Sequence, residues 1–126
     1  MANMNRRTIL VVDDEDYVAN LDEAILLRGG FDVMIARTGQ SALALLRDNP
    51  GRFALILLDF RLPDFNGVEL SGLIRAADPG VKIVVSSGYF GDDIVSRFDY
   101  DIAFLQKPYT ADRLINAVES TLNKAA

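Results

Sequence analysis

Acidic, hydroxyl and amino side chains follow short apolar runs of the chain: Asp13 and Asp14, Asp59, Ser87 and Lys107. Carboxylates gathered at one point repel, by about 4 kcal/mol for two charges about 4 Å apart at an effective dielectric of about 20. A divalent cation relieves this repulsion, and Mg²⁺ binds one or two carboxylates together with water and phosphate oxygens. A hydroxyl and a lysine complete the nucleophile and charge neutralisation that phosphoryl transfer requires. If the fold brings these side chains together, they predict a magnesium-dependent phosphoryl-transfer site.

The apolar runs that precede these residues must position them. The runs are short and rich in β-branched residues, which is typical of strands covered on both faces. We expect strands at 8–12, 31–36, 53–58, 81–86 and 102–105. The alternation of strands with helical segments predicts one α/β domain with a doubly wound parallel sheet between two layers of helices.

Helical spacing of apolar residues follows each predicted strand. The apolar face of the first helix is expected to carry Val18, Leu21, Ile25 and Leu26. Later helices are expected to begin at Thr38, Asn66 and Thr110, and Asn66 forms a capping-box pattern with Glu69. The fourth helix, near 92–98, is predicted to be short.

The strand order decides whether the acids meet. In doubly wound sheets, ligands bind beyond the carboxyl ends of the strands, where the strand order reverses. With the order 2-1-3-4-5, the first and third strands are neighbours at that point. Asp13 and Asp14 should therefore converge with Asp59 although they lie far apart in the chain.

Composition narrows the function classes. The 126 residues include no cysteine and no histidine, so thiol chemistry and histidine-based catalysis are excluded. The net charge is −5 and basic residues are scattered, which argues against a direct nucleic-acid surface. No apolar stretch is long enough for a membrane span, and the N-terminal "MANMNRR" lacks the apolar stretch of a signal peptide. We expect a soluble cytoplasmic protein with a single domain at 1–126 and a core at about 8–122.

Four motifs in this order resemble the receiver domain of two-component response regulators. They are "VVDDE", "LLDFRLPDFNG", "SSG" and "KP", and the resemblance covers roughly residues 8–122. It implies a flavodoxin-like (βα)5 fold. It also implies that Asp59 accepts a phosphoryl group, that Asp14 and Asp59 hold Mg²⁺, and that Asp13 acts mainly through bound water. The backbone carbonyl of Arg61 would be a further metal ligand.

The resemblance also assigns the groups around the phosphoryl oxygens. Ser87 would hydrogen-bond one oxygen with help from the amide of Gly88, and Lys107 would pair with another. Phe104 occupies the aromatic switch position of the family, and its rotamer would follow Ser87 as Ser87 moves toward the phosphate.

Purely structural interpretations compete with some of these assignments. Glu15 and Asp16 are expected only to favour the positive end of the first helix. Ser87 could be a strand-end hydroxyl that satisfies nearby backbone groups, Lys107 could belong to a turn before proline, and Phe104 could be a core residue.

Two features depart from the family pattern. The segment between Ser87 and Lys107 is shorter than is typical, which shortens the fourth helix and alters a surface that the family commonly uses for docking. Arg61 and Tyr89 are bulky groups flanking the expected route of the attacking water, and the sequence assigns no direction to their effect.

The resemblance implies a phosphorelay function in which the product changes affinity for an output partner that the sequence does not identify. The phosphoryl donor would be a histidine kinase or a histidine phosphotransfer protein, because this chain has no histidine. We expect the chain not to act as an enzyme on external substrates. It could form a homodimer. The segments "SGY" and "FLQKPY" resemble the corresponding segments of receiver domains attached to hybrid sensor kinases.

Two other classes of protein are alternatives. A docking module independent of phosphorylation would be expected to lack some of these residues. A magnesium-dependent phosphatase of the haloacid dehalogenase type would place its nucleophile after the first strand and leaves Asp59 unexplained.

Overall fold

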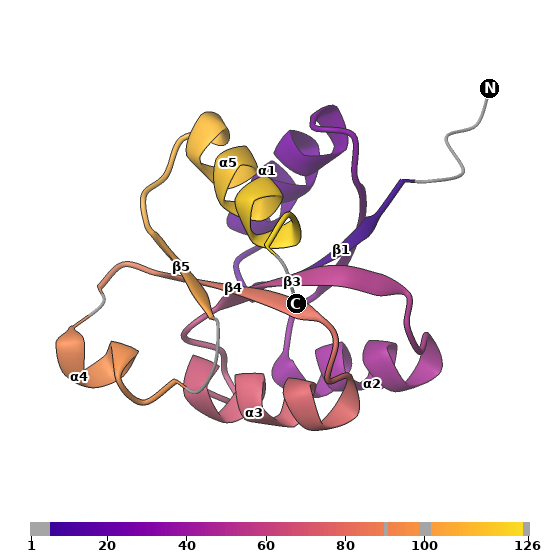
Figure 1. Ribbon diagram of the computed structural model, residues 1–126. Helices are drawn as coiled ribbons and strands as arrows, with labels where there is room; N and C mark the ends of the chain where they lie inside the picture. Colours follow the sequence, from indigo (N-terminus) through magenta and orange to yellow (C-terminus); the bar gives the residue numbers. More distant parts are fainter. Residues whose placement is uncertain (1–5, 90, 99–101, 125–126) are drawn as a thin grey trace.

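A parallel five-stranded sheet forms the middle layer of the protein (Figure 1). The computed structural model describes residues 6–89, 91–98 and 102–124. The strands are β1 (Thr8–Val12), β2 (Asp32–Ala36), β3 (Phe53–Asp59), β4 (Lys82–Ser87) and β5 (Ala103–Gln106). Their order, β2-β1-β3-β4-β5, confirms the prediction. Strands β3 and β4 extend one residue beyond the predicted ends, so Asp59 and Ser87 are their last residues.

Helices cover both faces of the sheet. They are α1 (Asp16–Arg28), α2 (Gly39–Asp48), α3 (Gly67–Ala77), α4 (Asp92–Val95) and α5 (Ala111–Leu122). Figure 1 shows α1 and α5 on one face and α2 and α3 on the other. The fold is therefore the flavodoxin-like three-layer arrangement that the sequence predicts, with a short fourth helix.

The predicted helix starts are present. The side chains of Thr38 and Asn66 accept hydrogen bonds from the backbone N–H groups of Ser41 and Glu69, and both helices have reciprocal capping boxes. Thr110 accepts from the N–H of Arg113 at 3.2 Å and so caps α5. These side chains satisfy backbone donors that have no partner within the helix.

Asp64 adds a second support to the start of α2 from the loop after β3. Its two carboxylate oxygens accept from the N–H groups of Gly39 and Gln40, each at 2.9 Å. Burial opposes ionisation here, but the N–H donors of Gln40 and Gly39 outweigh it and lower the pKa of Asp64. The loop beyond the end of β3 is thereby tied to a neighbouring helix.

Two apolar cores sandwich the sheet, because alternate side chains of each strand point to opposite faces. Leu55 and Leu57 of β3 belong to the core under α1 and α5, whereas Ile56 and Leu58 belong to the core over α2 and α3. All four are almost completely buried. Full burial of such a side chain contributes about 1.5–3 kcal/mol relative to exposure. This two-sided burial explains the unbroken apolar run.

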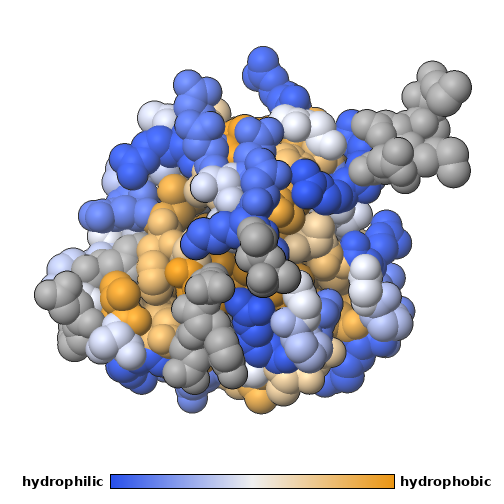
Figure 2. All heavy atoms as spheres, viewed as in Figure 1, coloured by the Kyte–Doolittle hydropathy of each residue, from blue (hydrophilic) through white to orange (hydrophobic). Residues whose placement is uncertain are grey.

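The face of the protein drawn in Figure 2 is largely polar. Figure 2 shows hydrophilic colours over most of the helical layers and hydrophobic colours gathered beside β5, at the edge of the sheet. Within the described part of the chain, every helix is too short or too polar to cross a bilayer.

Candidate functional site

Three carboxylates meet at the carboxyl edge of the sheet, as predicted. Asp13 and Asp14 follow β1, and Asp59 ends the neighbouring strand β3. One carboxylate oxygen from each residue lies within 4.8 Å of the others. Asp13 and Asp59 are buried, whereas Asp14 is exposed. The cluster therefore has a buried floor and one acid open to solvent.

Backbone pairing brings these acids level with one another. Val12 is paired with Leu58, which places Asp13 beside Asp59 one residue further along. The N–H of Asp13 donates to the carbonyl of Ala36 at 3.0 Å and extends the pairing with β2 past the end of β1. Asp13 Oδ1 then accepts from the N–H of Glu15 at 3.0 Å, which fixes the turn that carries Asp14.

Lys107 completes the cluster from the segment after β5. Its Nζ lies 3.2 Å from Asp59 Oδ1 and 3.5 Å from Asp13 Oδ2. Its backbone N–H donates to the carbonyl of Ser87 at 2.7 Å, which holds the segment against the end of β4. Burial disfavours the charged ammonium, but Asp59 and Asp13 outweigh this effect and raise the pKa of Lys107.

Lys107 does not fully compensate for the burial of Asp59 beside the other acids. Burial raises the pKa of Asp59 to about 6; Lys107 opposes this rise, and Asp13 adds to it. A single ammonium therefore does not compensate for burying the carboxylate next to another acid. Carboxylate oxygens are the ligands that hard divalent cations prefer, so Asp13, Asp14 and Asp59 could hold such an ion.

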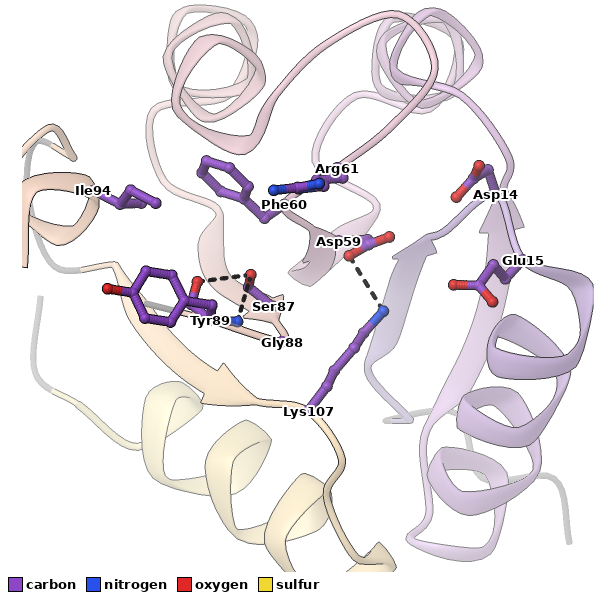
Figure 3. A pocket seen from close by; sticks show the side chains of 10 residues that line it. All are labelled: Asp14, Glu15, Asp59, Phe60, Arg61, Ser87, Gly88, Tyr89, Ile94 and Lys107. Carbon is purple, nitrogen blue, oxygen red and sulfur yellow. Dashed lines mark hydrogen bonds and ion pairs between the residues drawn. The ribbon is translucent and has the colours of Figure 1, made fainter. Parts of the chain in front are cut away.

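An open pocket of about 580 Å³ lies over the cluster (Figure 3). The predicted site residues that line it are Asp14, Asp59, Arg61, Ser87, Gly88 and Lys107. They come from the ends of four strands, which explains why residues spread along the chain share one cavity. Asp13 lies beneath, in contact with Lys107.

Ser87 reaches the pocket, but its hydroxyl is directed at its own loop. Ser87 Oγ donates to the carbonyl of Tyr89 at 3.0 Å and accepts from the N–H of Tyr89 at 3.3 Å. Figure 3 shows these bonds apart from the Asp59–Lys107 pair. In this structure Ser87 therefore makes the strand-end contacts of the simpler interpretation.

Phe104 is not among the residues that line the pocket. It is half-buried on β5 and packs edge-to-face on Phe98, with ring centroids 5.3 Å apart. Phe98 in turn packs on Phe60, the residue after Asp59, at 6.2 Å. These three rings, here called the aromatic row, connect β5 with the loop after β3.

The sequence predicts a role for Glu15 only at the start of the first helix. Glu15 is indeed the N-cap residue of α1, but its side chain also lines the pocket and points into it beside Asp14 (Figure 3). Asp16 instead pairs with Arg37 on the outside. The signal for Glu15 was its position directly after the two acids. Ile94, on α4, also lines the pocket, and no motif pointed to it.

The fold and this pocket define a flavodoxin-like α/β domain with an acidic site at the switch point between β1 and β3. Residues 9–119 match the protein-family model described as the response regulator receiver domain. The chain belongs to this family, whose members serve in two-component systems.

Curated relatives support the assignment. The chain is 39% identical over 113 residues to a response regulator receiver protein of Anaeromyxobacter sp. strain Fw109-5, covering 88% of this chain and 46% of that protein. It is 32% identical to the DNA-binding response regulator MtrA of Mycolicibacterium smegmatis, covering 94% and 52%. It is 29% identical to the sensor kinase CckA of Brucella abortus, covering 93% and 13%. The chain thus spans about half of these relatives or less.

Solved structures agree. A response regulator receiver protein from Sinorhizobium medicae WSM419 is 30% identical, with a TM-score of 0.85 over 96% of this chain and 98% of that one. A receiver domain protein from Methanospirillum hungatei JF-1 is 28% identical, with a TM-score of 0.84 over 94% and 95%.

Proposed function

We propose that this chain is a phosphoacceptor: Asp59 receives a phosphoryl group in the presence of Mg²⁺, and the product changes the affinity of the domain for a partner. The observation that carries the proposal is the placement of Asp59. Its buried carboxylate lies in a cluster of three acids, 3.2 Å from Lys107, at the floor of an open pocket. A nucleophile, a cation site and a fixed positive charge thus share one point.

The acids supply the proposed metal site. Asp14 and Asp59 would hold Mg²⁺ directly, the carbonyl of Arg61 would be a further ligand, and Asp13 would act mainly through bound water. Mg²⁺ supplies charge neutralisation for the phosphoryl oxygens. The donor set fits this ion, because all of these ligands are oxygen atoms.

Besides Mg²⁺, the transfer uses groups of this chain and of the donor. An Asp59 carboxylate oxygen attacks the phosphorus of a phosphohistidine, and a P–O bond forms as the P–N bond breaks. The electron pair of the broken bond returns to the imidazole nitrogen, which takes up a proton from solvent, so that the donor leaves with a neutral imidazole ring. Lys107, which is paired with Asp59 Oδ1 in the structure, would neutralise a phosphoryl oxygen on the product.

The switch begins at Ser87. The phosphoryl group adds about −1.5 to −2 charge to the end of β3. Ser87 gives up its bonds to Tyr89 and binds a phosphoryl oxygen, with help from the amide of Gly88. Phe104 adjusts to the moved Ser87 on the β5 side. The output is a shift between two surface states with different partner affinity.

The donor must come from another protein or segment, because the sequence contains no histidine. A histidine kinase or a histidine phosphotransfer protein would supply it. One relative is a sensor kinase and another is a DNA-binding response regulator, so related domains occur beside different outputs. In this proposal the chain acts as a switch and turns over no external substrate as its main role.

The test compares the wild-type protein with Asp59→Asn and with Asp48→Asn, which alters an exposed acid at the end of α2. Each is incubated with acetyl phosphate with and without Mg²⁺ and examined by intact mass, and beryllium fluoride binding is followed by amide NMR. We expect one magnesium-dependent adduct in the wild type and in Asp48→Asn, and none in Asp59→Asn. A wild type without adduct or spectral change would overturn the proposal, and steady phosphate release from many substrates would favour a phosphatase.

A further inference from the structure

A buried carboxylate lies on α1, outside the pocket. Asp22 is 2% exposed, and both of its carboxylate oxygens accept from the hydroxyl of Tyr109, at 2.8 and 2.9 Å. Burial raises the pKa of Asp22 to about 6, against the lowering effect of the Tyr109 hydrogen bond. Burying a carboxylate lowers the free energy of unfolding unless hydrogen-bond donors compensate for it. A buried acid at this position therefore suggests a role for its hydrogen bond.

Tyr109 places this contact next to the site. It lies two residues after Lys107 and packs against the core under α1 and α5. On the other side of Tyr109, Thr110 caps the start of α5. The Asp22–Tyr109 hydrogen bond therefore joins α1 to the short segment between β5 and α5.

Lys107 is thus held from two sides. Its own N–H is bonded to the carbonyl of Ser87, while Tyr109 is bonded to α1. Val18 and Leu21 of α1 line a shallow apolar groove together with Asp22, Lys107 and Tyr109. The segment that carries Lys107 accordingly lies along α1 before the ammonium reaches Asp59 and Asp13.

A lysine side chain has many rotamers and loses them when it is fixed at one point. Restricting the backbone from which it extends lowers that cost. We propose that Asp22 and Tyr109 are positioning residues: their hydrogen bond tethers the segment after β5 to α1 and thereby sets the reach of Lys107 to Asp59. The value of this tether for phosphoryl binding rests on the function proposed above, whereas its effect on Lys107 does not.

A different explanation would be electrostatic, because Asp22 and Lys107 carry opposite charges and interact. Two variants separate the tether from the charge. Tyr109→Phe removes the donor and keeps the Asp22 carboxylate. Asp22→Asn removes the charge but keeps an acceptor oxygen for Tyr109. The matched control is Tyr17→Phe, which removes the hydroxyl of an exposed tyrosine on α1, the helix that carries Asp22.

The first measurement uses the metal-free protein. NMR of the Lys107 ε-methylene group, assigned by its loss in Lys107→Arg, shows two separate proton signals when the side chain is held and one averaged signal when it rotates freely. We expect separate signals in the wild type, Tyr17→Phe and Asp22→Asn, and one averaged signal in Tyr109→Phe. Thermal unfolding of each variant confirms that it is folded.

The second measurement compares Mg²⁺ affinity with beryllium fluoride affinity at saturating Mg²⁺. Tyr109→Phe should bind beryllium fluoride about tenfold more weakly, because Lys107 then makes less of one charge-assisted contact. It should bind Mg²⁺ at least as tightly as the wild type, because Lys107 pairs with the same carboxylates. Unchanged Lys107 signals in a folded Tyr109→Phe protein, or averaged signals in Asp22→Asn alone, would overturn the tether. If the wild type fails to bind beryllium fluoride, the proposed function fails and the Lys107 signals still decide the tether.

Discussion

The ammonium of Lys107 and Oδ1 of Asp59, 3.2 Å apart, join the segment after β5 to the end of β3 across the intervening strand β4. Lys107 also contacts Asp13 after β1. One side chain thus spans most of the sheet edge on which the pocket lies. The charge balance of the site accordingly depends on a residue from outside the acidic motifs.

Removing this ammonium should make Asp59 harder to ionise. In the metal-free protein, Lys107→Ala should raise the pKa of Asp59 above its value of about 6, because burial remains while the opposing charge is lost. Carbon NMR of the Asp59 carboxyl group in the presence of a chelator measures this. Lys82→Ala, at the start of β4, is the control, and an unshifted midpoint in Lys107→Ala would contradict the prediction.

The acid run after β1 should divide into functional and structural members. Asp14→Asn should weaken Mg²⁺ binding by at least about tenfold. Even the loss of a residue that only hydrogen-bonds to a metal ligand typically lowers metal affinity by about 10–100-fold. Asp16→Asn should leave Mg²⁺ affinity close to that of the wild type, because Asp16 pairs with Arg37 instead. Calorimetric titration with Mg²⁺ measures both, and equal losses would show that net charge alone attracts the ion.

The stability of the metal-free protein should fall as the pH rises from about 4 to about 6. Burial raises the pKa of both Asp22 and Asp59 from 3.8 to about 6. In this window the folded chain keeps protons that the unfolded chain has released. The free energy of unfolding that comes from these two protonated carboxyls is therefore complete below about pH 3.8 and is lost as the pH rises through about 6.

Urea unfolding with a chelator at stepped pH values measures the effect. Asp22→Asn should flatten the profile by removing the share of Asp22, whereas Asp48→Asn, at an exposed position, should keep the wild-type slope. A wild-type slope in Asp22→Asn would show that this carboxyl has the same pKa in the folded and unfolded chain.

Two glycines should respond to alanine with opposite signs. At Gly39 a Cβ would lie 2.3 Å from Cδ2 of Phe65, so Gly39→Ala should cost about 1–3 kcal/mol of unfolding free energy. At Gly72, inside α3, a Cβ would meet no described atom within 4 Å. Gly72→Ala should therefore add about 0.5–1 kcal/mol through helix propensity. Urea unfolding at one pH compares them, and destabilisation by Gly72→Ala would refute the packing argument.

The convergence of Asp13, Asp14 and Asp59 could be predicted because it follows from two regularities. Asp13 and Asp59 each end an apolar run that is long enough only for a strand, and Asp14 follows Asp13 directly. Parallel strands bring their carboxyl ends to one edge. The strand order then decides which ends are neighbours. None of this requires knowledge of individual side-chain contacts.

The Asp22–Tyr109 pair could not be predicted in this way. Leu21 was expected on the apolar face of α1, yet it is 48% exposed, while the neighbouring Asp22 is almost fully buried. An acid inside a helix usually faces solvent, and its partner here is 87 residues further along the chain. The rotamer of Ser87 could not be predicted either, because a strand-end hydroxyl can bond to its own loop or to a ligand.

The unbroken apolar run of β3 does little by itself to define the pairing register of the strand. A slip by one residue would exchange leucines and isoleucine between two cores that both accept them, so hydrophobicity alone penalises the slip weakly. Drawing Asp59 one step inward would bury a carboxylate away from Lys107, which costs far more. The acids at the strand ends therefore also favour the native pairing register over a one-residue slip.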